Sequence, residues 1–66
     1  MLVTYTNSNP QFQEAVVEGA TGLIIEGVSV NPEKVVTYTL PDHTTEDQLA
    51  ALDLYMRDLG YARVTT

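Results

Sequence analysis

The only histidine of the chain, His43, lies close to three carboxylates, those of Asp42, Glu46 and Asp47. An imidazole beside carboxylates can act as a general base or hold a metal ion. Catalysis would also need a nucleophile and an orienting partner, which no motif in the chain supplies. Glu46 and Asp47 also suit the N-terminus of a helix. We therefore expect His43 to be an exposed loop residue, and we expect no catalytic residue, cofactor or metal.

Other signatures of chemistry are missing from the sequence. The four glycines form no phosphate-binding run, and the acidic residues lack the spacing of a calcium loop. Ser8 and Ser29 do not lie in a nucleophile motif. Because the chain has no cysteine, disulfides and thiolate metal sites are excluded. These observations predict a protein that is not an enzyme.

The charge of the chain limits its partners. Nine acidic residues against three basic ones, Lys34, Arg57 and Arg63, give a formal net charge of −6. Nucleic acids and anionic membranes attract clusters of basic residues, so neither is an expected partner. No apolar run is long enough to span a bilayer, and the first residues do not resemble a secretory signal. We expect a cytoplasmic protein whose acidic surface either meets a basic partner or only maintains solubility.

One leucine has no obvious structural role. Leu54 lies about 170–180° around the predicted helix from its apolar stripe, and its neighbours there are Ala51, Asp47 and Asp58. An exposed leucine ringed by carboxylates can anchor a partner protein with an apolar pocket and a basic rim, although isolated surface leucines are also common. These four residues are the predicted partner-binding site.

The elements that must position these residues begin with a repeat. The sequence Val-Thr-Tyr-Thr occurs at residues 3–6 and again at residues 36–39. Alternation of β-branched or aromatic residues with threonine predicts two strands, with Tyr5 and Tyr38 facing the core and the threonines facing outward. The repeat arises either from duplication or by chance, since strands use few residue types.

The first helix is predicted over residues 10–18. Asn9 can cap it, Pro10 suits its first position, and Gly19 can end it. Its buried face is expected to carry Phe12, Ala15 and Val16, while its wet side carries Glu14 and Glu18.

The second helix begins with the capping box formed by Thr45 and Gln48. Asp53 and Arg57 are spaced to pair along it, and Gly60 is expected to end it. Its apolar stripe consists of Leu49, Leu52, Met56 and Leu59, with Tyr55 at the border.

The remaining segments predict three strands. Residues 23–30 form the first, in which Gly27 marks either a β-bulge or a tight Glu26-Gly27 hairpin. A type I turn at residues 31–34 leads to a strand over 35–40. Residues 61–65 close the chain. In this last strand Ala62 and Val64 are expected to face the core, and Tyr61 and Arg63 to join the threonines on the outer face.

Residues 1–66 are thus expected to form one small α+β domain in the order β-α-β-β-α-β. This is the ferredoxin-like, split βαβ pattern, an antiparallel sheet with two helices on one face. The first and third strands would be antiparallel neighbours at its centre.

The predicted function is that of a small acidic protein-binding module, acting as an inhibitor, adaptor or accessory subunit of a larger protein. Short proteins of this character are typical of bacteriophages and mobile elements. The alternatives are a regulatory domain that binds a small molecule as a homodimer, and a small self-assembling structural protein. A core of this size rarely supplies more than about 3–5 kcal/mol. Additional stability can come from self-association, for example as a homodimer, or from a partner protein, and a well-packed monomer is the third possibility.

Overall fold

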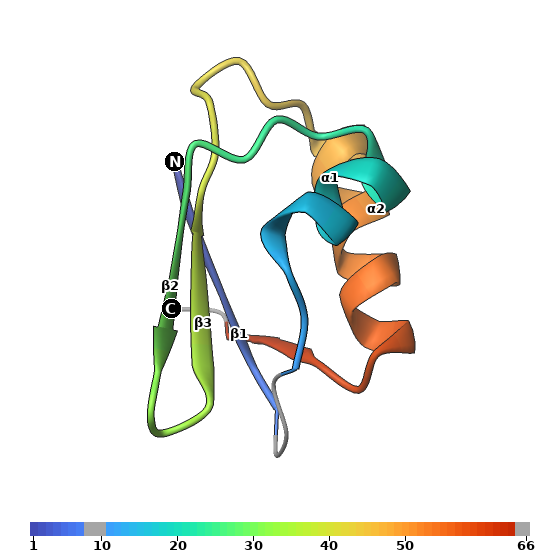
Figure 1. Ribbon diagram of the computed structural model, residues 1–66. Helices are drawn as coiled ribbons and strands as arrows, with labels where there is room; N and C mark the ends of the chain where they lie inside the picture. The colour runs from blue at the N-terminus through green and yellow to red at the C-terminus, as the bar shows by residue number, and fades with distance from the viewer. Residues whose placement is uncertain (8–10, 65–66) are drawn as a thin grey trace.

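The computed structural model describes residues 1–7 and 11–64, which form a small α+β structure (Figure 1). The four strands make one antiparallel sheet in the order β2-β3-β1-β4, and both helices lie on the same side of it. The predicted order of elements is confirmed. The elements are β1 (Leu2–Thr6), α1 (Glu14–Thr21), β2 (Gly27–Asn31), β3 (Val35–Thr39), α2 (Glu46–Asp58) and β4 (Ala62–Val64).

The two Val-Thr-Tyr-Thr segments are antiparallel neighbours at the centre of the sheet, as predicted. Thr4 pairs with Thr37, and their hydroxyl oxygens lie 3.2 Å apart. Tyr5 and Tyr38 are both buried, whereas the threonines are half-buried on the opposite face. The repeat therefore marks the two central strands and directs their large side chains toward the helices.

The core fills the space between the sheet and the helices. An aromatic series crosses it: Tyr38 lies 6.2 Å from Tyr5 and 5.7 Å from Phe12, and Phe12 lies 5.4 Å from Tyr61, all between ring centroids. Such ring pairs contribute packing energy beyond the burial of apolar area. The buried residues are Val3, Tyr5, Val17, Leu23, Ile25, Val36, Tyr38, Leu40, Leu52, Met56 and Tyr61.

The position of the first helix was predicted wrongly. It spans Glu14–Thr21 and ends at Gly22, which has φ = +72°, whereas residues 11–13 precede it. The expected roles of Asn9 and Pro10 lie outside the described residues. Glycine ends helices in the left-handed conformation, and Gly22 rather than Gly19 takes it.

The buried face of α1 also differs from the prediction. Val17 is fully buried, whereas Ala15 and Val16 are exposed and Phe12 packs on the core from outside the helix. Glu18, expected on the wet side, is half-buried, and its carboxylate accepts a hydrogen bond of 3.0 Å from the Ile25 N–H. The carboxylate thereby holds the segment after the helix.

That segment, residues 22–26, forms no strand: the strand that was predicted over residues 23–30 begins only at Gly27 and ends at Asn31. Leu23 and Ile25 are buried and Ile24 is exposed. Two side chains of this apolar run therefore pack in the core, although the segment itself is not part of the sheet. At the start of β2 the Glu26 N–H donates to the Thr39 carbonyl at 2.8 Å, and the next residue, Gly27, is the one paired with Thr39. Gly27 therefore marks the start of β2, so neither a bulge within a longer strand nor a tight Glu26-Gly27 hairpin is found there.

The connection between β2 and β3 is the predicted hairpin. The Asn31 carbonyl accepts a 2.9 Å hydrogen bond from the Lys34 N–H, and the Asn31 side chain accepts one of 2.7 Å from the Glu33 N–H. Lys34 has φ = +69°, which fits a three-residue loop that ends in a left-handed residue.

The capping box of α2 is confirmed. The Thr45 hydroxyl accepts a hydrogen bond from the Gln48 N–H, and the Gln48 side chain accepts one from the Thr45 N–H. Leu52 and Met56 are fully buried, and Leu49 and Tyr55 are partly buried against the core. Leu59, predicted as part of the buried stripe, is 43% exposed because the helix ends there.

The face of the last strand was predicted wrongly. Tyr61, expected outside, is buried in the core, whereas Ala62 and Val64 are exposed. Val64 pairs with Thr4, while Arg63 pairs with Tyr5 and so lies on the helix side. Shifting a strand by one residue exchanges its two faces. The end of the predicted strand, at Thr65, lies outside the described residues.

Within the described chain, neither helix is long and apolar enough to cross a membrane.

Candidate functional site: a groove between α2 and β4

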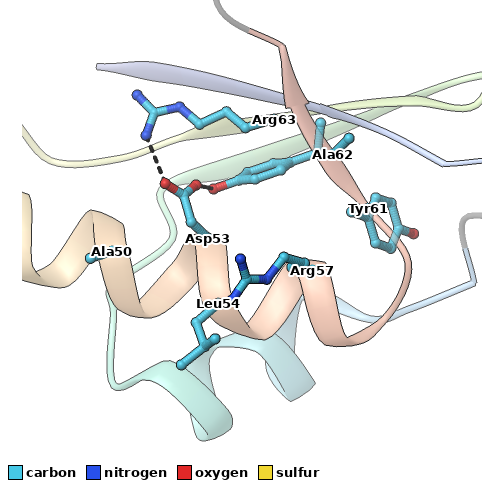
Figure 2. Close-up of a pocket in the computed structure, with 8 residues that line it drawn as sticks. Ala50, Asp53, Leu54, Arg57, Tyr61, Ala62 and Arg63 are labelled. Atoms are coloured by element: carbon cyan, nitrogen blue, oxygen red, sulfur yellow. Dashed lines mark hydrogen bonds and ion pairs between the residues drawn. The ribbon is translucent and has the colours of Figure 1, made fainter.

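One carboxylate ties α2 to the sheet. The Tyr5 hydroxyl, from β1, donates to Asp53 Oδ1, and Arg63 Nη1, from β4, donates to Asp53 Oδ2 at 3.0 Å (Figure 2). The sequence predicted that Asp53 would pair with Arg57. The structure pairs it with Arg63, because the register of β4 turns that arginine toward the helix.

The tyrosines of the core are held neutral. Burial, and next the hydrogen bond to Asp53, raise the pKa of Tyr5 well above its ordinary value. Burial is likewise the main reason why the pKa of Tyr38 is raised. Burial also raises the pKa of Tyr61, against a smaller lowering effect of the Asn7 side chain. The hydroxyls of Tyr5 and Tyr38 therefore act as hydrogen-bond donors, to Asp53 and to Met56 Sδ, and not as bases.

A groove of about 590 Å³ opens beside the Asp53–Arg63 pair (Figure 2). Leu54 and Arg57 form its wall on α2, while Ala62 and Arg63 form its wall on β4. A smaller hollow of about 290 Å³ shares Ala50, Asp53 and Arg63 with the groove. The residues that line the groove are Tyr5, Ala50, Asp53, Leu54, Arg57, Tyr61, Ala62 and Arg63.

The charges in the groove are unusual for this chain, because two of its three basic residues line it. Asp53 accepts hydrogen bonds on both oxygens, from Tyr5 and from Arg63. In the part of the chain that the structure describes, Arg57 forms no ion pair. A guanidinium offers planar, paired donors that suit a carboxylate or a phosphate. The groove can therefore accept one anionic group beside the apolar side chain of Leu54.

The four residues of the predicted partner-binding site are all exposed on α2. Leu54 is 53% exposed, and Asp47, Ala51 and Asp58 are exposed too. Only Leu54 lines the groove. Their spacing of four, three and four residues places them along one side of the helix.

Sequence reasoning missed the other side chains of the groove. The sequence predicts Arg63 and Tyr61 on the outer face of the sheet and pairs Asp53 with Arg57 of its own helix. The signal that could have located them was the register of the last strand. Placing Tyr61 in the core would have turned Arg63 toward α2.

His43 lies elsewhere, exposed in the loop before α2, and lines neither hollow. No group of three or more His, Cys, Asp or Glu side chains among the described residues could hold a metal ion.

The chain matches no protein-family model, and comparisons with curated proteins and with solved structures gave no match.

Proposed function

We propose that the chain is a small, acidic, non-catalytic protein-binding module that acts as an inhibitor, adaptor or accessory subunit of a larger protein. The observation that carries this proposal is Leu54, which is 53% exposed at the rim of the α2–β4 groove. An apolar side chain beside a concave surface gives a partner both a knob to enclose and a hollow to fill. Interfaces depend on a few such anchors surrounded by polar contacts.

The chemistry around Leu54 defines the complementary partner. Asp47 and Asp58 lie exposed on the same helix, so the partner surface carries basic residues around the pocket that receives Leu54. Arg57 is exposed and has no ion partner among residues 1–7 and 11–64, so a single acidic group of the partner fits the groove. This pattern of charges supports a specific protein surface over a uniformly charged one.

The test compares two leucine substitutions on α2. Leu54→Lys introduces a charge at the proposed anchor, whereas Leu59→Lys makes the same change at a leucine that is 43% exposed and does not line the groove. Each variant is immobilised and used for affinity capture from a bacterial lysate, after circular dichroism has shown that it is folded. We expect a partner retained by the wild type and by Leu59→Lys to be lost with Leu54→Lys.

A partner captured equally by both variants would place the binding surface elsewhere. Capture of no protein by the folded wild type would argue against the binding module itself.

A second function is favoured by the volume of the groove. Its 590 Å³ falls in the range of about 300–1,000 Å³ typical of small-molecule sites, and Arg57 offers a contact for a carboxylate or phosphate. A regulatory domain that binds such a metabolite is the alternative. A rise in melting temperature with a carboxylated metabolite, lost in Arg57→Gln, would favour it over the binding module.

The strand order β2-β3-β1-β4 with two crossover helices also supports assignment to the ferredoxin-like architecture. That assignment does not indicate the function, because one architecture serves many unrelated activities.

A further inference from the structure

The two edges of the sheet differ in how they are protected. β4 is three residues long and carries Arg63. Short strands and charged side chains are devices that prevent an edge from pairing with another chain. β2, at the other edge, spans five residues, Gly27–Asn31, and contains no charged residue and no proline. Among the described residues β2 pairs only with β3, so its outer edge is open to another strand.

The hairpin shows which backbone groups of β2 point outward. The Asn31 carbonyl accepts the hydrogen bond from the Lys34 N–H, so the backbone groups of Asn31 point toward β3. Successive residues of a strand alternate in the direction of their N–H and C=O groups. The backbone groups of Val28 and Val30 therefore point away from β3, toward the open edge.

The other side of β3 gives the same result. Met1 and Leu40 exchange two hydrogen bonds, of 2.8 and 3.0 Å, so the backbone N–H and C=O of Leu40 point toward β1. Alternation from Leu40 turns Thr37 toward β2, where its partner is Ser29. The backbone N–H and C=O of Ser29 thus point toward β3, and those of its neighbours, Val28 and Val30, point outward.

The side chains at this edge are apolar. Val28 pairs with Tyr38 and Val30 with Val36, so both valines are on the helix side of the sheet. The helices do not cover them fully: Val28 is 37% and Val30 is 55% exposed, whereas their partners are buried. The outward backbone groups and the exposed apolar side chains thus belong to the same two residues of β2, Val28 and Val30.

We propose that β2 pairs in antiparallel fashion with β2 of a second copy of this chain, about a two-fold axis at Ser29. Val28 then lies opposite the partner's Val30, and Val30 lies opposite the partner's Val28. Each pair exchanges two hydrogen bonds, so four bonds engage every outward N–H and C=O group of both valines. The four valine side chains make one apolar strip across the joined edges. Two four-stranded sheets become one eight-stranded sheet.

The structure favours this register over its neighbours. An axis through Val30 places Val28 opposite the partner's Pro32, which has no N–H to donate. An axis through Val28 places Val30 opposite the partner's Glu26. The Glu26 N–H already donates to the Thr39 carbonyl, so that pair would lack a hydrogen bond.

A second copy fits this edge despite the net charge of −6. The strand carries no charge, and the proposed register places Gly27 opposite the partner's Asn31 and Glu26 opposite the partner's Pro32. No carboxylate therefore faces another along the paired strands. β2 and β4 are opposite edges of the sheet, so this interface is separate from the α2–β4 groove. The dimer proposal can therefore be tested independently of the proposed function.

Sedimentation equilibrium of the wild-type chain, from about 1 µM to about 1 mM, tests the proposal. The average mass should rise from 7.3 kDa toward twice that value. Val30→Lys should raise the dissociation constant about tenfold or more, because lysine on an edge strand opposes pairing. Val64→Lys is the matched control: it adds the same charge at an exposed valine of the opposite edge strand. Its dissociation constant should match that of the wild type.

Amide hydrogen exchange gives a second measurement that needs no substitution. Exchange at Val28 and Val30 should slow as the concentration rises, whereas exchange at Ser29, which already faces β3, should not change. A monomer at every concentration would overturn the proposal. So would a dimer that Val64→Lys disrupts and Val30→Lys does not, or a dimer in which the Val28 and Val30 amides exchange as in the monomer.

Discussion

At the scale of single residues, Asp53 joins three elements. Its carboxylate accepts from Tyr5 of β1 and from Arg63 of β4, and it projects from α2. The ion pair with Arg63 is over a third exposed on both side chains, so solvent screening reduces its value. The bond from Tyr5 ends on the same carboxylate, but its donor belongs to a buried side chain, so we expect solvent to weaken it less.

We expect Asp53→Asn to lower the free energy of unfolding by about 1–2 kcal/mol, because hydrogen bonds to a charged acceptor are worth more than those to a neutral one. Urea unfolding measures this difference. Asp58→Asn removes the same charge at an exposed position of α2 and should change the free energy of unfolding by less than about 0.5 kcal/mol. Equal effects of the two variants would contradict the role assigned to Asp53.

The tyrosines predict how stability depends on pH. Because the folded state raises the pKa of Tyr5 and Tyr38, their contribution is fully present below the unfolded value of about 10 and is lost as pH rises above it. The free energy of unfolding should therefore fall above about pH 10. Tyr5→Phe removes one titrating group and should flatten this fall by up to about 1.4 kcal/mol per pH unit. Urea unfolding at several alkaline pH values measures both slopes, and identical slopes would contradict the prediction.

At the scale of elements, α1 shows how a boundary is decided. The sequence predicts its end at Gly19, whereas the structure ends it at Gly22, three residues later. Gly22 takes the left-handed conformation and its N–H donates to the Glu18 carbonyl at 2.8 Å, while the Glu18 carboxylate accepts from the Ile25 N–H beyond the helix. These contacts join segments that the helical periodicity does not relate.

The two glycines make a matched pair of substitutions. Gly22→Ala should lower the free energy of unfolding by about 1 kcal/mol or more, because its φ of +72° strains an alanine. Gly19→Ala should raise it by about 0.5–1 kcal/mol, because the site is helical and no atom lies within 4 Å of the added Cβ. Chemical unfolding of both variants measures the signs. The reverse order would indicate that the helix ends at Gly19.

β4 is the element in which prediction failed most completely. The sequence of this short strand allows either of its faces to point toward the core, since Ala62 and Val64 are as suitable for a core as Tyr61. The structure places Tyr61 inside, where it packs edge-to-face on Phe12. The larger side chain buries more apolar area, and Arg63 gains Asp53 as a partner.

At the scale of the whole molecule, the net charge of −6 acts on a small fold. Like charges repel in the compact state, and salt screens that repulsion. We expect the melting temperature to rise between about 10 mM and about 500 mM sodium chloride. Calorimetry at low protein concentration keeps self-association out of the measurement. A fall with salt would show that two ion pairs, Asp53 with Arg63 and Asp42 with the Met1 amino group, outweigh the repulsion.

The two proposed interfaces lie on different surfaces of the molecule and suit different partners. The α2–β4 groove, with Leu54 at its rim, is the candidate surface for a different protein, whereas the β2 edge suits a second copy. Of these, the sequence predicted the exposure of Leu54 through helical geometry alone. It did not predict the groove, because the groove needs Arg63 of β4 and Arg57 of α2 on the same side.

The sequence by itself determined the order of elements, the two central strands, the hairpin turn and the capped second helix. Each of these depends on interactions between residues a few positions apart, such as Thr45 with Gln48 and Asn31 with Lys34. Only the tertiary structure decided the end of α1, the face of β4 and the Asp53–Arg63 pair. Those features depend on which side chains compete for one core, and local patterns do not contain that information.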